Sequence, residues 1–510
     1  MKKTSRTLTV ICVLLVSGFI LWSQQETKLA FTLSLEQGNP GKFHVIFYCE
    51  GITGETLDFK MPAISPGYYR VLDFAGNVEN FNAEDASGNP LPWEKTGKNT
   101  WRVGSSKSAA VRVSYDVKSD FTSVAQSFID HKRAYISSPS VFMYLDGQIN
   151  HPVTVTLIPP ANFPKISTGL DPWPDKTNTY YAQNFDIFYD CPIYLGSQEV
   201  ISFDVQGISH CVAMENPGTF DRQEFMSDLK KMIETATAIV GDIPYRHYTF
   251  ILMGEGKGGL EHLNSSALFI AVPGGKNPWC DKKNMKFLTH EYFHLYNVKR
   301  IRPIALGPFD YDRENNTDML WFSEGGTVYY EYIILNRAGF LNRNQCLDDF
   351  STTIAGSKNN PAHLKQSVAE ASLKAWTQSF FGSENQVSYY DIGLALSILL
   401  DLKIRHETKN KKSLDNVMRA CYYEFYKKKQ RGFTDGEFRQ VCENIAGTSL
   451  SDFFAYIYNP GEIDYTKYFA YAGLAVEIPG DIKAKGTFRI TRLPNPTPLQ
   501  LEVLEGWLKE

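Results

Sequence analysis

Two histidines four residues apart, with a glutamate directly after the first, are the residues of this sequence best suited to chemistry. His290 and His294 lie in the stretch KFLTHEYFHLYNVKRIRP, which begins at Lys286. On a helix, residues four apart share a face, so both imidazoles can reach one zinc ion while Glu291 points into the same space. A carboxylate beside a zinc-activated water is the arrangement of a metallopeptidase. The motif is short, so the rest of the chain must support this interpretation.

A catalytic zinc site needs a third protein ligand and an open fourth position. Glu324 is the best candidate, because it lies at the start of a long apolar helix, LWFSEGGTVYY, that is predicted to end near Gly339. A carboxylate facing inward on such a helix is unfavourable unless it is paired or binds a metal. The alternative is a partly exposed glutamate that stabilises the first helical turn through the helix dipole. The other carboxylates considered are Asp310, Asp312, Glu314, Asp318 and Glu331.

A glycine-rich segment, GEGKGGLEHLNSS, follows a strand predicted at residues 248–254. Its Glu261 could hold the α-ammonium group of a peptide as a charge-assisted pair, which would make the enzyme an exopeptidase. Gly258 and Gly259 would let a peptide backbone approach closely. No Lys-Ser or Lys-Thr follows them, so the segment is not a phosphate-binding loop. A glutamate on a surface loop is the alternative.

Three cations, Lys299, Arg300 and Arg302, follow the histidine motif. Cations suit the C-terminus of a helix, and Pro303 cannot continue one. We therefore expect these residues to close the helix that carries the motif, with a contact to a substrate carboxylate or to a group behind the metal site as the alternative.

The composition is that of a globular chain, with 510 residues, a net charge of −4, 43% hydrophobic and 21% charged residues. It lacks a basic stripe, so no nucleic-acid partner is expected. Lys2, Lys3 and Arg6 precede an apolar run at residues 8–22, which is the pattern of a secretory signal peptide. The run is shorter than the about 20 residues of a spanning helix, so we favour cleavage over an uncleaved membrane anchor. The protein is then expected to be periplasmic or secreted.

The cysteines leave two possibilities open. An exported chain permits disulfides, and Cys191 with Cys211 or Cys421 with Cys442 could pair. Buried free thiols fit the sequence at least as well. The chain has no C-x-x-C, which argues against a zinc or redox site built from cysteines.

The elements that must position these residues change in type along the chain. Between about residues 29 and 205, alternating runs such as FHVIFYCE and VRVSYDV predict an antiparallel β domain. The stretch RQEFMSDLKKMIETATAIVG then predicts an amphipathic helix that ends at Gly241. Beyond the histidine motif, the chain is predicted to be mainly helical to about residue 468. A short strand, TFRITRL, is predicted at residues 487–493.

Together these segments resemble the glycyl aminopeptidase family of gluzincin metallopeptidases. The resemblance rests on four separated stretches in the family's order: MPAISPGYYRVLDFAGNV from Met61, GGLEHLNSS from Gly258, the histidine motif with WFSEGGTVYYEY after it, and VSYYDIGLALSILLDLKIR from Val387. The resemblance implies a multidomain α+β fold. In that fold, an N-terminal antiparallel β domain precedes a thermolysin-like, mainly helical zinc peptidase domain with a small β-sheet.

The same resemblance implies roles for individual residues. It implies one Zn²⁺ ion per chain, held by His290, His294 and Glu324, with Glu291 as the catalytic base. It also implies that Tyr390 stabilises the oxyanion of the reaction. A packed core tyrosine with a satisfied hydroxyl is the alternative for Tyr390.

The expected division of the chain is a signal peptide at 1–23, a β domain at 26–205, a catalytic domain at 206–470 and a short tail at 471–510. The family usually carries a C-terminal PDZ domain, so the tail is expected to be a remnant of that region. The predicted function is zinc-dependent removal of small N-terminal residues, Gly or Ala, from peptide substrates. A zinc endopeptidase on the same scaffold and a catalytically silent peptide-binding protein stay open as alternatives.

Overall fold

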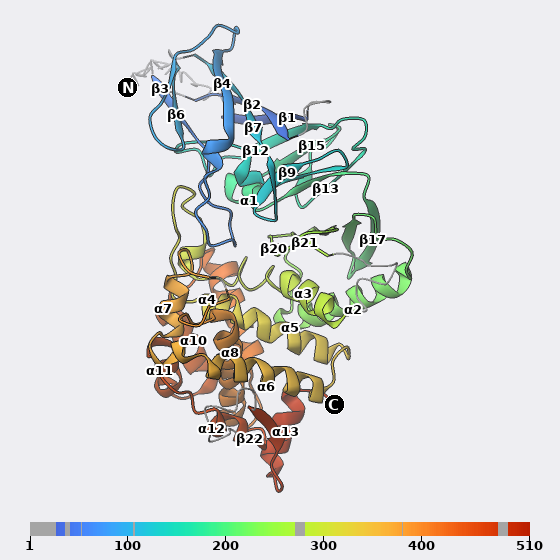
Figure 1. Cartoon of the computed structure of the whole chain (residues 1–510), viewed down its shortest axis with the longest axis vertical. Helices are drawn as coiled ribbons and strands as arrows, with labels where there is room; N and C mark the ends of the chain where they lie inside the picture. The colour runs from blue at the N-terminus through green and yellow to red at the C-terminus, as the bar shows by residue number, and fades with distance from the viewer. Residues whose placement is uncertain are drawn as a thin grey trace, which may run out of the picture.

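The computed structural model describes residues 27–35, 41–52, 54–105, 108–270, 281–379, 381–477 and 488–510. The predicted signal peptide lies outside the described residues, and so does Cys280. Within the described ranges, no helix is long and apolar enough to cross a membrane. Figure 1 shows a β domain at one end of the long axis and a helical domain at the other, so the predicted α+β fold class is confirmed.

The largest sheet of the N-terminal domain has seven strands in the order β14-β15-β12-β1-β2-β7-β4. These strands are β1 (Lys28–Leu35), β2 (Lys42–Glu50), β4 (Val78–Asp85), β7 (Ala110–Lys118), β12 (Val153–Ile158), β14 (Asp171–Pro172) and β15 (Thr179–Ala182). Buried and partly exposed residues alternate along β1 and β2, as expected for strands with one face on a core. The sheet is antiparallel except where β1 pairs with β12 in parallel.

Two smaller antiparallel sheets complete this domain, in the orders β13-β16-β10-β9-β8 and β11-β3-β6-β5. Their strands are β3 (Thr56–Lys60), β5 (Trp93–Lys95), β6 (Thr100–Gly104), β8 (Asp120–Ser123), β9 (Gln126–Ile129), β10 (Arg133–Ile136), β11 (Tyr144–Leu145), β13 (Lys165–Thr168) and β16 (Ile193–Gly196). A short helix, α1 (Phe185–Tyr189), packs on β15 and brings acidic residues toward the second domain.

The second domain begins with a five-stranded mixed sheet in the order β17-β18-β19-β21-β20. Its strands are β17 (Glu199–Val205), β18 (Ile208–Met214), β19 (His247–Met253), β20 (Gly259–Glu261) and β21 (Ser265–Phe269). Strand β17 pairs with β18, so this sheet begins before the domain boundary expected at residues 205 and 206. Within the glycine-rich segment, Gly259–Glu261 form the edge strand β20, which pairs with β21.

The helical layer follows the sheet. Its helices are α2 (Arg222–Val240), α3 (Lys282–Phe293), α4 (Leu320–Ser323), α5 (Gly325–Arg337), α6 (Arg343–Asn359), α7 (Val368–Leu373), α8 (Tyr389–Glu407), α9 (Leu414–Cys421), α10 (Asp435–Ala446), α11 (Ser451–Tyr458) and α12 (Tyr465–Ala470). Helix α2 confirms its prediction, since Asp221 caps its N-terminus and Gly241, at a φ of 88°, ends it.

Helix α3 carries the histidine motif, but it is shorter than predicted. After Phe293 the chain continues as turns to Arg300, so the predicted capping of this helix by Lys299 and Arg300 is wrong. Both cationic side chains are buried, at 7% and 3% exposure. Lys299 donates to a carboxylate oxygen of Asp190 at 2.8 Å, and Arg300 donates to the carbonyl of Leu263 at 2.8 Å. The turn thus binds the motif to the β-sheet side of the molecule.

Two glycines hold Glu324 close to Tyr390. Gly325 follows Glu324, and Gly393 lies one turn after Tyr390 in α8. A Cβ atom on Gly325 would lie 2.4 Å from the backbone of Gly393, and one on Gly393 would lie 2.1 Å from the carbonyl oxygen of Trp321. Because no side chain fits between them, the backbones of α5 and α8 pack directly against each other.

The last described residues pack into the helical domain. They form β22 (Leu474–Glu477), β23 (Arg489–Arg492) and α13 (Pro498–Trp507). The indole of Trp507 donates to the Tyr329 hydroxyl at 3.1 Å, and the Lys509 N–H donates to Asn336 Oδ1 at 2.8 Å. The strand expected at residues 487–493 is therefore β23, and this tail is built onto α5 and α6.

The described cysteines are free thiols. They are Cys49, Cys191, Cys211, Cys346, Cys421 and Cys442, and all except Cys211 are buried. Neither candidate pair, Cys191 with Cys211 or Cys421 with Cys442, forms a disulfide, so the alternative of free thiols holds for both.

A chain of hydrogen bonds anchors α3 to the sheet. The hydroxyls of Tyr292, in the histidine motif, and Tyr245 lie 2.7 Å apart, and the Tyr245 hydroxyl lies 2.8 Å from His210 Nε2 on β18. His210 Nδ1 lies 2.9 Å from the carbonyl of Ile208, which can only accept. The proton of His210 is therefore on Nδ1, and its Nε2 accepts from Tyr245.

Acid is expected to weaken this anchor. Burial lowers the pKa of His210 from 6.5 to about 4, so the imidazole takes up a proton at a lower pH in the folded protein than in the unfolded chain. The stability from neutral His210 is present above pH 6.5 and is lost as the pH falls towards about 4. Between about pH 7.5 and about pH 5 the loss is about 2 kcal/mol. Urea unfolding of the wild type and of His210→Asn at both pH values measures this loss in the free energy of unfolding.

The variant is expected to lose about 2 kcal/mol less than the wild type over this interval. His131→Asn, which changes an exposed histidine, serves as the control and should keep the wild-type dependence on pH. Equal losses in the wild type and His210→Asn would contradict the assignment of a neutral buried His210.

Candidate metal centre and peptide site

The three predicted metal ligands meet in one group, in which His294 and Glu324 are buried and His290 is partly buried. His290 Nε2 lies 3.0 Å from His294 Nε2. Oxygen Oε2 of Glu324 lies 3.4 Å from His294 Nε2 and 3.8 Å from His290 Nε2. Among the described residues, these three side chains form a group whose ligand atoms all lie within 4.8 Å of one another, close enough to hold one metal ion. The donors come from α3, its C-cap and the junction of α4 with α5.

Each histidine has its other ring nitrogen bound, which leaves Nε2 for the centre of the group. His290 Nδ1 lies 3.3 Å from Glu331 Oε2, and His294 Nδ1 lies 2.7 Å from the carbonyl oxygen of Asn297. Both acceptors hold a proton on Nδ1, so the Nε2 lone pair is free for a metal. The turn after α3 makes the second of these bonds, because it folds the Asn297 carbonyl back towards His294.

The charges of the group favour a cation at its centre. Burial opposes protonation of His290, but hydrogen bonds to Glu324 and Glu331 outweigh burial and raise its pKa to about 10. The pKa of His294 is also raised, since the charge of Glu324 outweighs burial. Burial would raise the pKa of Glu324, but the two histidines hold it well below its usual range. A divalent ion supplies the positive charge that protons supply here, so the residues fit zinc with its nitrogen and oxygen ligands.

Glu291 lies beside the metal group and against β20. Its side chain is 6% exposed, and burial raises the pKa of its carboxyl to about 7. A Cβ atom on Gly259 would lie 2.5 Å from Glu291 Oε1. Gly259 was predicted to admit a peptide backbone, and in the structure Glu291 fills the space above it. Gly258 has a φ of 97° and more open surroundings, with Val124 as its near contact at 3.5 Å.

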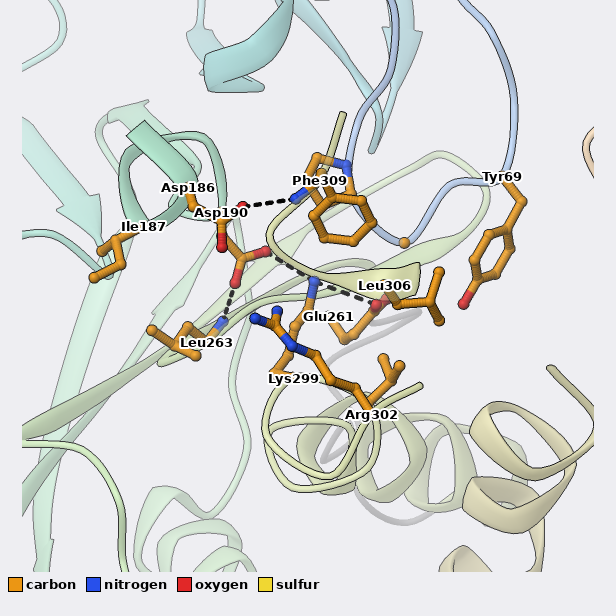
Figure 2. Close-up of a pocket in the computed structure, with 13 residues that line it drawn as sticks. Tyr69, Asp186, Ile187, Asp190, Glu261, Leu263, Lys299, Arg302, Leu306 and Phe309 are labelled. Atoms are coloured by element: carbon orange, nitrogen blue, oxygen red, sulfur yellow. Dashed lines mark hydrogen bonds and ion pairs between the residues drawn. The ribbon is translucent and has the colours of Figure 1, made fainter. Parts of the chain in front are cut away.

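Glu261 lies in a buried network of charges behind the metal group. It is 4% exposed, and its Oε1 is 3.4 Å from Lys299 Nζ. Lys299 also donates to Asp190, so the lysine lies between two carboxylates (Figure 2). Burial lowers the pKa of Lys299, but Asp190 and Glu261 outweigh burial and raise it. Among the described residues, no group donates a well-formed hydrogen bond to Glu261 Oε1.

A small cavity of about 30 Å³ adjoins Glu261. Figure 2 shows Tyr69 on one side of Glu261 and the Lys299 side chain between Glu261 and Asp190. The remaining lining residues are Pro66, Gly67, Asp186, Ile187, Leu263, Val298, Arg302, Leu306 and Phe309. The cavity thus joins the N-terminal domain, the sheet and the turn after α3.

Tyr390 lies at the metal group as expected from the later helical segment. Its ring centroid is 6.4 Å from that of His290 and 5.4 Å from that of Phe381. Burial raises the pKa of its hydroxyl, and the charge of Glu324 acts in the same direction, so Tyr390 stays protonated. It therefore can donate a hydrogen bond near the metal.

Two family models match the chain. The model of the peptidase M61 N-terminal domain matches residues 30–197, and that of the M61 glycyl aminopeptidase matches residues 283–396. Together they cover more than half of the 510 residues. The chain belongs to the M61 glycyl aminopeptidase family. With its His-His-Glu group, this M61 chain is a zinc metallopeptidase of the aminopeptidase class.

Solved structures share the fold of the M61 chain. An aminopeptidase N family protein from Idiomarina loihiensis has a TM-score of 0.82 and 27% identity, over 90% of this chain and 81% of its own. An M1 zinc metallopeptidase from Deinococcus radiodurans has a TM-score of 0.55 and 11% identity, over 86% and 96% of the two chains. Yeast LTA4 hydrolase has a TM-score of 0.53 and 15% identity, over 87% and 69%. No curated protein matches the chain.

Several residues of the M61 site were not predicted from the sequence. Tyr69 donates to Glu324 Oε1 at 2.7 Å, although it belongs to the N-terminal domain. Glu331 was considered as a metal ligand, and it instead binds the far side of His290. Lys299 and Asp190 were not connected with Glu261. The tyrosines of the SPGYYR stretch, which directly follow a Pro-Gly turn, are the signal that could have pointed to Tyr69.

Proposed function

We propose that the protein removes small N-terminal residues, glycine or alanine, from peptides, with one zinc ion held by His290, His294 and Glu324. Glu291 is the general base, and Glu261 binds the α-ammonium group of the substrate. The observation that carries this proposal is the state of Glu261, a buried carboxylate near the metal group whose Oε1 accepts no well-formed hydrogen bond from the described residues and has only the longer ion pair with Lys299, at 3.4 Å. A cationic N-terminus is the donor that a peptide offers.

The charge of the cavity supports an ammonium ligand. Its lining contains three carboxylates, from Asp186, Asp190 and Glu261, and two cations, from Lys299 and Arg302. One negative charge is left over, so an incoming ammonium group would neutralise the cavity. Burying an unpaired charge is unfavourable, and the substrate would relieve that cost.

The residues around the metal group have defined parts in hydrolysis. Zinc, when bound, acts as a Lewis acid that polarises the scissile carbonyl and activates water. Glu291 takes a proton from the attacking water and returns it to the leaving amine, which suits a carboxyl whose pKa burial raises to about 7. Tyr390 donates to the oxygen that gains negative charge, since its hydroxyl stays protonated beside His290.

The preference for small residues is supported by the size of the cavity. A volume of about 30 Å³ next to Glu261 is about the room of one or two water-sized groups. Glycine brings no side chain, and alanine brings one methyl group.

A peptide as the class of substrate has separate support. A mutant of the Deinococcus radiodurans M1 enzyme, which shares this fold, was solved with a Tyr-Ser-Ala substrate.

We also propose that the enzyme acts outside the cytoplasm, in the periplasm or after secretion. The support is the charged and apolar pattern at residues 1–23. Peptide substrates in that compartment would be fragments with free N-termini.

Replacement of Glu261 tests the proposed function. Glu261→Gln keeps the shape of the side chain and removes its charge, so KM for the free tripeptide Gly-Ala-Ala should rise by roughly 10- to 100-fold. Acetylation of the same peptide should abolish its cleavage by the wild type. Initial rates of glycine release over a range of peptide concentrations measure both effects.

Glu255→Gln is the matched control, because Glu255 is an exposed glutamate in the same glycine-rich segment. It should keep the wild-type KM. Cleavage of the acetylated peptide at the rate of the free peptide would instead show a zinc endopeptidase.

A further inference from the structure

A loop of the N-terminal β domain, residues 65–70, reaches the metal group of the helical domain. The hydroxyl of Tyr69 donates to Glu324 Oε1 at 2.7 Å, and its side chain is buried at 3% exposure. The other oxygen of Glu324, Oε2, is the one that faces His290 and His294. The two carboxylate oxygens therefore have separate partners: Oε1 accepts from Tyr69, and Oε2 faces the two histidines.

This division of partners restricts how Glu324 can turn. A carboxylate at the end of a side chain rotates easily unless its oxygens are held. With Oε1 bound to Tyr69, rotation that takes Oε2 away from the histidines would break a buried hydrogen bond. Groups that orient a metal ligand in this way raise the affinity of the site for the metal.

The backbone of the loop is held in an unusual conformation at this contact. Tyr69 has a φ of 43°, in the left-handed region that side-chain-bearing residues rarely adopt. The conformation is maintained by the neighbouring contacts. Arg70 donates to the carbonyls of Ala375 and Gln378, and the ring of Trp376 meets that of Tyr69 at 6.1 Å. Such a conformation persists where the surroundings enforce it, here from the helical domain.

The same loop also touches the second carboxylate of the site. Gly67 has a φ of 87°, and a Cβ atom on it would lie 2.4 Å from Glu261 Oε1 and 2.9 Å from Oε2. Glu261 therefore occupies the space that the missing side chain leaves. Residues 65–70 thus border the metal ligand Glu324 at one point and Glu261 at another.

We propose that this loop of the N-terminal domain positions both carboxylates. Tyr69 is a positioning residue for Glu324 and sets the zinc affinity. Gly67 leaves the room in which Glu261 meets the peptide N-terminus, and this second part rests on the proposed function. The β domain then completes the site, and the helical domain alone would bind zinc and peptide more weakly.

The first experiment measures zinc affinity by competition with a chelator in Tyr69→Phe. Loss of the hydroxyl should weaken zinc binding by roughly 10- to 100-fold. Tyr115→Phe is the control, since it removes a buried hydroxyl of the same domain that donates to the carbonyl of Val141 and not to a metal ligand. Its zinc affinity should equal that of the wild type. Zinc affinity of Tyr69→Phe within twofold of the wild type would overturn the proposal, as would slower turnover with unchanged zinc affinity.

The second experiment compares Gly67→Ala with Gly88→Ala. Gly88 has a similar φ of 85° but no atom within 4 Å of an added Cβ, so it reproduces the backbone strain without the contact. Gly67→Ala should raise KM for Gly-Ala-Ala by roughly tenfold or more, because Glu261 must move, while zinc affinity stays near that of the wild type. Equal KM values in the two variants would overturn the part played by Gly67. If Glu261→Gln itself left KM unchanged, the proposed function would fail while the result for Tyr69 stood.

Discussion

Replacing Glu291 with glutamine is expected to lower kcat by roughly 10²- to 10⁴-fold while zinc binding stays intact. Glutamine has the shape of glutamate but cannot take the proton of the attacking water. The fold should tolerate the change, because burial already disfavours the charged carboxylate and raises its pKa to about 7. The measurement is the rate of glycine release at saturating peptide and zinc, with the zinc content of the purified variant determined alongside.

Glu234→Gln provides the matched control, since Glu234 is an exposed glutamate on α2, away from the site. Its kcat should equal that of the wild type. A Glu291→Gln variant that held zinc and kept more than about a tenth of the wild-type kcat would contradict the role of general base.

Replacing His294 with alanine is expected to abolish stable zinc binding and to lower activity by about 10³-fold or more, because the metal supplies several kcal/mol of stabilisation to the transition state. The change also removes a partner of the buried Glu324, so the variant should be less stable than metal-free wild type by roughly 3 kcal/mol. Zinc should raise the unfolding temperature of the wild type and leave that of the variant unchanged. Thermal unfolding with and without zinc measures this difference.

Comparison with metal-free wild-type protein separates the effect of losing the metal from the effect of losing the His294 side chain. His131→Ala changes an exposed histidine and should respond to zinc as the wild type does. An unfolding temperature that rose equally with zinc in His294→Ala and in the wild type would place the metal elsewhere.

Local patterns were enough to predict much of the fold and the metal group. The helical period and the glycine at position 241 predicted α2 and its end closely. The spacing of His290 and His294 required a shared helix face, and an inward carboxylate on an apolar helix required a partner, which predicted that Glu324 would join them. These inferences succeed because the relevant contacts are set by one helix and its neighbour.

The rest of the site depends on contacts between distant segments. Tyr69 reaches Glu324 from 255 positions earlier in the chain, and Lys299 meets Asp190 across 109 positions. No periodicity relates such residues. The end of α3 after Phe293 was also missed, because the turn is stabilised by buried contacts of Arg300 with the sheet side and not by local helix signals.

The central claim is that zinc at His290, His294 and Glu324 drives removal of single residues from free peptide N-termini. The most direct test strips the protein with a chelator, adds zinc in steps, and follows the products from Gly-Ala-Ala and its acetylated form by mass spectrometry. The predicted result is release of free glycine that rises with zinc up to one equivalent per chain, with the acetylated peptide intact. Activity that is independent of zinc, or cleavage of the acetylated peptide, would contradict the claim.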